Sequence, residues 1–529
     1  MTVRTLAFAI AAASGILVSP VRAADSATLD ADDCTVLAAL DFAESVGVAV
    51  TLAASVAPAA GDVPARCRVT GTIAPETAFE AWLPLADWNG RLLATGCYNL
   101  CGSLRTDQME DAAARGYATV TMDGGHSDAK YPDSRWAYNN TTLEDEFGHR
   151  ALHLATVLAK ELVRAFYGDD SNYAYFRGCS TGGRQGLVAA ERYPEDYDGI
   201  VAGAPFNQRL SIQHLIWADR ANTDTSGKPI LRGPQFARLH AAVLDTCDAA
   251  DGQVDGIVGD PERCAFNPAT LACATDKPAD DCLTPAQVTA TARIYAGPVD
   301  SAGRALAAFG AMPGSELTWE QQLIGQDGKP PYFRFIGQNW LRFHAFEPDP
   351  PPSPGDILFD FDKDPARLAA SAARIGYTGE LERFAARDGR LIVHHGWSDE
   401  SLQPAYTLEY WRAAQRMNGG TENLDRFARL FMLPGVQHCG GGPGAGDIDY
   451  LAAIERWVEA DEAPAMLVGT RTKDSVATLQ RQTRFPVPGE ILLRRPVFAY
   501  PALARYKGEG DPLDPAAYLR ERPPARSDR

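Results

Sequence analysis

The stretch around Ser180 holds the residue types that nucleophilic catalysis requires. Residues 173 to 177 are typical of a short strand, residues 184 to 192 are typical of a helix, and Gly-Cys-Ser-Thr-Gly-Gly at 178 to 183 lies between them. A strand, a sharp Gly-x-Ser-x-Gly turn and a helix form a nucleophile elbow, whose turn lifts the serine hydroxyl above a sheet. We therefore predict Ser180 as a nucleophile and the backbone N–H of Thr181 as a donor to an oxyanion. Without this setting, the short motif also arises by chance in a chain with 47 glycines.

Two later loops supply the partners that a serine nucleophile needs. Serine is a poor nucleophile at its ordinary pKa and requires a histidine base that a carboxylate orients. In this type of fold the order along the chain is serine, then Asp or Glu, then histidine. Asp399 follows a strand-like run at 390 to 393, and His438 follows another at 427 to 433. Loops after strands are where α/β sheets hold active-site residues, so we predict the triad Ser180, Asp399 and His438.

An alternating pattern of strands and helices has to position these loops. Short apolar runs at 91 to 95 and 117 to 122 are typical of strands, and 150 to 166 has apolar residues at helical spacing. The same alternation of strand-like and helix-like runs returns after residue 389, with helix-like runs at 408 to 417 and 450 to 460. Such alternation predicts an α/β fold with βαβ units.

The composition changes between the two halves of this pattern. Residues 207 to 388 contain Asp/Gly turn signals, four cysteines, many aromatic residues and a Pro-rich stretch at 348 to 354. We predict a discontinuous core at 24 to 206 and 389 to 519, an inserted lid domain at 207 to 388, and a solvated tail at 520 to 529. The length of 529 residues alone suggests about three domains, whereas this organisation needs two.

The N-terminus is typical of a secretory signal peptide. Arg4 precedes an apolar run from about Leu6 to Val18, and small residues lead to Ala23, after which we expect cleavage. The run is too short to span a bilayer, and a buried core helix is the alternative interpretation. We therefore expect a chain that is secreted or periplasmic once residues 1 to 23 are removed. Cysteines form disulfides in those compartments.

The ten cysteines are an even number, which suits a disulfide framework. Connectivity does not follow from the count, but short separations in the sequence favour three local pairs: Cys97 with Cys101, Cys247 with Cys264, and Cys273 with Cys282. A fourth pair, Cys34 with Cys67, would hold the mature N-terminus in place. A zinc site is the alternative, but no Cys-x-x-Cys or Cys-x-x-His spacing occurs. The remaining cysteines are Cys179 and Cys439.

These two remaining cysteines flank two of the predicted catalytic residues. Cys179 directly precedes Ser180, and Cys439 directly follows His438. A disulfide holds its two Cα atoms roughly 4.4 to 6.8 Å apart, and adjacent Cα atoms lie about 3.8 Å apart. A bridge between Cys179 and Cys439 would bring the serine and the histidine within side-chain reach of each other, whatever lies between them.

The composition excludes several classes of protein. With 45% hydrophobic and 22% charged residues, the chain can bury large cores and does not resemble a disordered protein. A formal charge of −18 argues against a nucleic-acid backbone or an anionic membrane surface as a partner. A small neutral or aromatic ligand remains, and the sequence makes no prediction of oligomeric state.

Several long motifs resemble those of one family of enzymes. The motifs lie at residues 178 to 186, 192 to 205, 395 to 399, 438 to 443 and 504 to 508, and they are similar to those of the tannase and feruloyl esterase family, which also includes mono(2-hydroxyethyl) terephthalate hydrolase. The resemblance implies an α/β-hydrolase core with an inserted lid and a Cys-Ser, Asp, His-Cys arrangement. It also implies hydrolysis of aromatic carboxylic esters.

The sequence departs from this family in two places. Relatives usually have a Gly-rich segment that supplies the second oxyanion donor, where this chain has Gly-Cys-Tyr-Asn-Leu-Cys-Gly at 96 to 102. We predict the backbone N–H of Cys97 as that donor. Phe498 stands where relatives often have a cysteine, so one family disulfide is not expected here.

A loop at 247 to 257 concentrates carboxylates and turn glycines. Calcium prefers six to eight oxygen ligands of this kind, but the spacing is not that of an EF-hand and such stretches are more often solvated turns. The resemblance to the family implies a structural Ca²⁺ here. The expected ligands are the side chains of Asp248, Asp251 and Asp255 and the carbonyls of Gln253 and Ile257.

Together these features favour an exported serine carboxylesterase that hydrolyses feruloyl, hydroxycinnamoyl or galloyl esters through an acyl-enzyme. The alternatives are a mono(2-hydroxyethyl) terephthalate hydrolase-like activity and a catalytically inactive hydrolase fold that binds phenolics. One aromatic cluster either stacks on the acyl group or packs the lid core: Tyr332, Phe333, Phe335, Trp340, Phe343 and Phe346. His394, beside a strand end, is predicted to be a packed histidine.

Overall fold

The computed structural model describes residues 31–130, 133–274, 282–325, 329–473, 475, 485 and 487–523. The predicted signal peptide at 1 to 23 and the last residues of the predicted tail, 524 to 529, lie outside the described residues. Within the described residues, no helix is long and apolar enough to cross a membrane.

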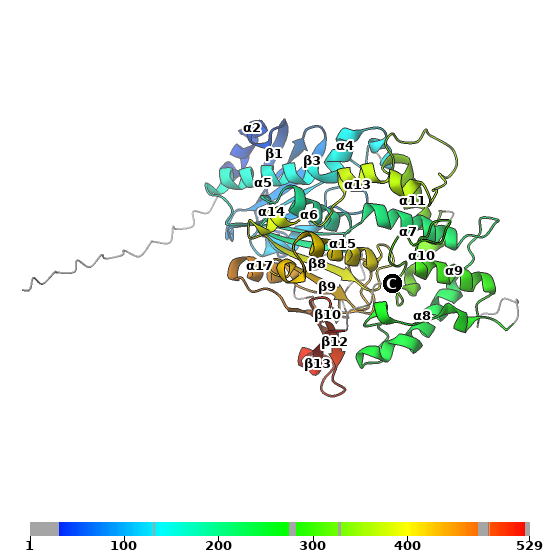
Figure 1. Cartoon of the computed structure of the whole chain (residues 1–529). Coiled ribbons are helices and arrows are strands. Elements are labelled where there is room, and N and C mark those ends of the chain that lie inside the picture. The colour runs from blue at the N-terminus through cyan, green and yellow to red at the C-terminus, as the bar shows by residue number, and fades with distance from the viewer. Residues whose placement is uncertain are drawn as a thin grey trace, which may run out of the picture.

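A nine-stranded sheet forms the centre of the molecule (Figure 1). Its order is β1-β2-β3-β5-β4-β6-β7-β8-β9. The strands are β1 Val50–Ala57, β2 Arg66–Ile73, β3 Thr77–Pro84, β4 Arg91–Thr95, β5 Ala118–Met122, β6 Tyr173–Cys179, β7 Gly199–Gly203, β8 Arg390–Gly396 and β9 Ala428–Leu433. The pairs from β5 to β9 are parallel, and β1, β2 and β3 extend the sheet in antiparallel pairs. The parallel part brings the carboxyl ends of β6, β8 and β9 to one edge.

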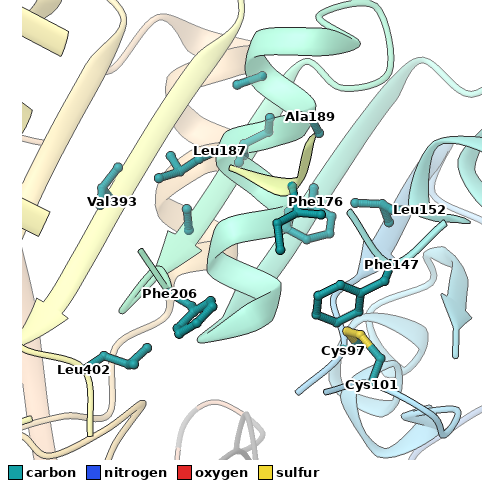
Figure 2. Close-up of a cluster of buried hydrophobic side chains, with 14 of the residues drawn as sticks. Cys97, Cys101, Phe147, Leu152, Phe176, Leu187, Ala189, Phe206, Val393 and Leu402 are labelled. Atoms are coloured by element: carbon teal, nitrogen blue, oxygen red, sulfur yellow. A yellow bond between two sulfur atoms is a disulfide. The ribbon is translucent and has the colours of Figure 1, made fainter. Parts of the chain in front are cut away.

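Helices cover both faces of the parallel strands, so alternate side chains enter two separate cores. Leu391 and Val393 of β8 pack with one cluster, and Ile392 between them packs with the other. The first face carries α5 Ala151–Tyr167, α6 Thr181–Arg192 and α15 Pro404–Met417; the second carries α3 Glu110–Ala114 and α17 Tyr450–Ala460. Figure 2 shows part of the first cluster, with Phe176 and Leu187 beside α6.

The chain between β7 and β8 spans the inserted segment predicted at 207 to 388. It contains α7 Gln208–Ala221, α8 Gly233–Cys247, α9 Pro285–Ala296, α10 Trp319–Leu323, α11 Tyr332–Phe343, α12 Asp364–Arg367, α13 Ala369–Ile375 and α14 Glu382–Ala385. Helices α7 to α11 gather on one side of the molecule, to the right in Figure 1. We refer to residues 207 to 388 as the lid.

A buried arginine fastens the lid to the core. The guanidinium of Arg184, on α6, donates to the carbonyls of Phe147 and Gly148 in the core at 2.9 and 2.7 Å, and to that of Ile375 in the lid at 2.8 Å. Because α6 starts directly after Ser180, these bonds hold the lid against the helix of the predicted nucleophile.

Two small sheets close the C-terminal part of the chain. β10 Met466–Thr472 pairs with β11 Ile491–Phe498, and β12 Leu503–Tyr506 pairs with β13 Tyr518–Glu521. The predicted solvated tail is exposed at residues 520 and 521, but these two residues lie in a strand. Arg520 and Glu521 belong to β13, because Ala504 and Leu503 of β12 pair with them.

Candidate active site

Ser180 occupies the sharp turn between β6 and α6. Its φ of 64° lies in the left-handed region, as a nucleophile elbow requires. The turn also needs a glycine at position 183, because a Cβ there would come within 2.1 Å of the carbonyl oxygen of Gly203 on β7. Helix α6 begins at Thr181, three residues before its predicted start at Arg184, so the Thr181 N–H lies in the first turn.

The three predicted triad residues form one chain of hydrogen bonds. Nε2 of His438 lies 3.1 Å from Oγ of Ser180, and Nδ1 of His438 lies 2.8 Å from Oδ2 of Asp399. All three side chains are buried, and Asp399 is 0% exposed. The arrangement can pass the serine proton to a histidine that is held by a carboxylate.

Opposite charges decide the protonation of this pair. Burial alone would raise the pKa of Asp399, but the positive charge of His438 and hydrogen bonds from two histidines hold that pKa well below its usual range. Burial would lower the pKa of His438, but Asp399 and Glu400 outweigh it and raise that pKa above 6.5. Asp399 is therefore an anion, and the His438 imidazole is more basic than a free one.

The disulfide between Cys179 and Cys439 joins the two loops of the site. The Cα atoms of these residues lie 6.0 Å apart, although 260 positions separate them in the chain. The structure also contains the other four predicted pairs: Cys34 with Cys67, Cys97 with Cys101, Cys247 with Cys264, and Cys273 with Cys282. Figure 2 shows the Cys97–Cys101 disulfide beside Phe147.

The loop that faces Thr181 differs from the prediction for the oxyanion donors. The backbone N–H of Cys97 donates to Oε1 of Gln185 at 3.0 Å, so it is not free to bind an oxyanion, and its predicted role is wrong. Asn99, two residues later, has a φ of 49° and lines the cavity with Ser180 and Thr181. Its carbonyl accepts a hydrogen bond from the Thr181 hydroxyl, which ties this loop to α6.

A cavity of about 850 Å³ opens at Ser180 and His438 between the core and the lid. Phe206, Leu215 and Trp340 contribute apolar walls, and Leu402 lines the same cavity. The predicted aromatic cluster divides in two. Phe333 and Phe346 are buried in the lid, whereas Tyr332 and Phe335 line the cavity with 38% and 48% of their surface exposed.

Two buried residues beside the triad were not predicted. His395 is 1% exposed, and its Nε2 lies 2.9 Å from Oδ2 of Asp399. Glu400 is also buried, and burial with the neighbouring Asp399 raises its pKa to about 7. The four-residue spacing of His395 and Asp399 is the one signal in the sequence that points to this contact. His394 stacks on Tyr450 with ring centroids 4.0 Å apart, as expected of a packed histidine.

The loop predicted to bind calcium faces an arginine in this structure. Both oxygens of Asp248 accept backbone N–H groups, from Asp255 at 3.1 Å and Gly256 at 2.9 Å. The Arg495 guanidinium binds Asp255 and lies 3.6 Å from Asp251. In the part of the chain that the structure describes, no group of three or more His, Cys, Asp or Glu side chains is arranged to hold a metal. The donor chemistry suits Ca²⁺, and the ion stays a prediction.

Comparisons with known proteins agree with this architecture. The model of a family described as "Tannase and feruloyl esterase" matches residues 61–330 and 364–519. Mono(2-hydroxyethyl) terephthalate hydrolase of Piscinibacter sakaiensis is 32% identical, over 89% of this chain and 87% of that protein. "Probable feruloyl esterase B-2" of Aspergillus flavus is 33% identical, over 75% of this chain and 77% of that protein. The solved structure of feruloyl esterase B from Aspergillus oryzae is similar to this chain, with a TM-score of 0.73 and 28% identity. The match covers 89% of this chain and 96% of the chain in that structure.

Because the Cys179–Cys439 disulfide joins the two loops of the site, we predict that it holds Ser180 within reach of His438. The double variant Cys179→Ala/Cys439→Ala should label with a fluorophosphonate at Ser180 at least about tenfold more slowly, because small displacements of reacting groups are costly. Labelling rates followed by mass spectrometry test this. The control is Cys34→Ala/Cys67→Ala, which removes a disulfide outside the site. Equal labelling rates in the folded site variant and the wild type would contradict the prediction.

Proposed function

The chain belongs to the tannase and feruloyl esterase family of carboxylic ester hydrolases, and we propose that it is an exported serine esterase acting on esters of aromatic acids. The observation that supports this most directly is the continuous chain of hydrogen bonds from Ser180 through His438 to Asp399. It opens into a cavity with aromatic walls.

The proposed reaction proceeds in two stages. Oγ of Ser180 attacks the ester carbonyl as Nε2 of His438 takes its proton, and Asp399 stabilises the imidazolium. The backbone N–H groups of Thr181 and Asn99 bind the oxyanion, in place of the Cys97 donor. His438 then protonates the leaving alcohol, and an acyl-enzyme remains on Ser180. Water, deprotonated by His438, attacks the acyl group and releases the acid.

The cavity walls support an aromatic acyl group. Tyr332 and Phe335, on α11, line the cavity and are partly exposed, so rings of a substrate can stack on them. This arrangement suits feruloyl, hydroxycinnamoyl or galloyl esters. The alternative substrate is a terephthalate monoester, as in the Piscinibacter sakaiensis relative. Lys329 lines the same cavity and supplies a cation for the free carboxylate of such a monoester, which favours that alternative.

Export is part of the proposal. The signal-like N-terminus and five disulfides support a secreted or periplasmic protein, because such bonds persist in oxidising compartments.

Replacing the nucleophile tests the proposed function. Ser180→Ala should lower kcat by about 10⁴-fold or more, because it removes the attacking oxygen. Initial rates on methyl ferulate, methyl gallate and mono(2-hydroxyethyl) terephthalate measure this loss and rank the three acyl groups. Ser226→Ala, in an exposed turn, is the control. Substantial turnover by a folded Ser180→Ala protein would overturn the assignment, and no turnover by the wild type would favour a binding protein.

The raised pKa of His438 predicts the pH dependence. The histidine must be neutral to act as a base, so kcat/KM should fall as the pH drops through its pKa, which lies above the ordinary 6.5. The acid limb measured on an uncharged ester should therefore have its midpoint above pH 6.5. Asp399→Asn should move the midpoint down and lower kcat by about 10⁴-fold. A wild-type midpoint below 6.5 would contradict the electrostatics described above.

Calcium binding at the 247 to 257 loop is proposed as a structural feature remote from the reaction. Asp248, Asp251 and Asp255 carry three negative charges against the one positive charge of Arg495, so a divalent cation would balance the loop. Removing Ca²⁺ with a chelator should lower Tm by about 2 °C or more, and adding Ca²⁺ should restore it. Asp255→Asn should weaken this response, and Asp224→Asn, in an exposed turn, should not. A Tm that does not respond to chelator or Ca²⁺ would show that Arg495 alone balances the loop.

A further inference from the structure

His395 and His438 share one carboxylate oxygen. Oδ2 of Asp399 lies 2.9 Å from Nε2 of His395 and 2.8 Å from Nδ1 of His438. We propose that His395 is a positioning residue, which holds the Asp399 carboxylate in the orientation that His438 requires. The proposal rests on the esterase function proposed above.

The contacts of His395 determine which ring nitrogen carries a proton. Nε2 lies 2.9 Å from the Asp399 carboxylate and also 2.9 Å from the carbonyl oxygen of Leu402. Both partners only accept hydrogen bonds, so Nε2 must carry the proton. Nδ1 then accepts from the Thr407 hydroxyl, 2.7 Å away on α15, in the neutral ring. The ring is therefore held at both nitrogens, and its N–H is aimed at Asp399.

The remaining donors show why this N–H matters. Oδ1 of Asp399 accepts the backbone N–H groups of Ser401 and Leu402, both at 2.8 Å. These two hydrogen bonds fix the position of Oδ1, but the carboxylate plane can still rotate about that oxygen. The bond from His395 fixes the other oxygen, so the plane of the carboxylate is set before His438 contacts it. A carboxylate orients a catalytic imidazole only when its own orientation is fixed.

The neighbouring histidine shows what a packed imidazole looks like in the same strand. Successive side chains of β8 point to opposite faces, so His394 and His395 face away from each other. His394 stacks on Tyr450, and its Nε2 has no hydrogen-bond partner among the described residues. His395, by contrast, has a hydrogen-bond partner at each of its ring nitrogens. Position in the strand alone therefore does not account for the bonds of His395.

The charged groups around His395 are few. Asp399 faces it directly, His394 precedes it on β8, and His438 reaches the same carboxylate oxygen from the loop after β9. Glu400 faces Asp399 and His438 and contributes negative charge there. Thr407, on α15, is uncharged. A change in the pH dependence caused by His395 therefore acts through Asp399, on His438 and on Glu400, which both face that carboxylate.

Three variants at two positions test the proposal, each with kcat, KM and the pH dependence of kcat/KM measured on the best ester of the panel. His395→Leu removes the donor and should lower kcat about tenfold with little change in KM, because a misplaced base slows chemistry more than binding. The acid limb should move down by about half a pH unit or more, toward 6.5, as His438 loses part of its contact with Asp399. His395→Gln keeps an N–H that can reach Asp399, so its kcat and the midpoint of its acid limb should lie close to those of the wild type. The control His394→Phe keeps a ring against Tyr450 and should leave the limb in place.

The outcomes separate positioning from packing. If the folded His395→Leu protein has the kcat and acid limb of the wild type, His395 only packs and the proposal fails. Equal defects in the Leu and Gln variants would also overturn it, because the N–H would then not be the cause. If His395→Leu does not fold, Thr407→Val is compared with the wild type instead. This variant removes the hydroxyl partner of His395 Nδ1 and should move the acid limb in the same direction by a smaller amount. An unchanged acid limb in Thr407→Val would refute the proposal. Failure of the esterase function itself would appear separately, as no turnover by the wild type, and failure of the Ser180 assignment would appear as turnover by Ser180→Ala.

Discussion

The buried negative charge of Asp399 is the constraint on which the rest of the site depends. A carboxylate without access to water is unstable unless other donors replace its hydration shell. Two backbone N–H groups and two imidazoles do so here. The loop after β8 must therefore fold back on its own aspartate, so that Ser401 and Leu402 present their N–H groups. The same charge raises the pKa of His438, which links the order of this loop to the basicity of that imidazole.

The Ser180 side of the site is held by a different kind of constraint. Ser180 has a backbone conformation that non-glycine residues rarely adopt, and such conformations persist only where the surroundings enforce them. The end of β6, the start of α6 and the close packing at Gly183 provide this enforcement. The Cys179–Cys439 disulfide then carries the constraint to the histidine loop, where Cys439 also has a positive φ of 61°. Charge orders one side of the site and covalent bonding orders the other.

Local patterns in the sequence predicted the parallel part of the fold well, because each strand and helix there carries its own periodicity. The predicted strand at 91 to 95 is β4, and the predicted helix at 450 to 460 is α17. The antiparallel strands β1 to β3 were not predicted, since alternation of strands and helices indicates parallel pairing only. The Cys97 donor failed for a related reason: its partner Gln185 lies 88 positions away, on a helix face that no local motif reveals.

The two adjacent histidines illustrate the same limit more sharply. His394 and His395 have one local sequence context, and the sequence predicted a packed ring for His394, which the structure shows, but no contact for His395. Only the pleat of β8 and the position of α15 decide which of them meets Asp399. The place of Ser180 in a turn between a strand and a helix depends on one short motif and is therefore predictable from sequence. A contact that depends on which face of a strand a neighbour covers is not.

The cavity that we propose holds the acyl group and the loop that we propose binds the oxyanion meet at Asn99. Its side-chain oxygen accepts a hydrogen bond from the Tyr332 hydroxyl of the lid at 3.1 Å, and its carbonyl accepts one from Thr181 at the start of α6. A lid residue that forms part of the acyl cavity therefore touches the same loop that we propose binds the oxyanion. Changes at Tyr332 would alter the fit of the acyl group and the position of Asn99 together.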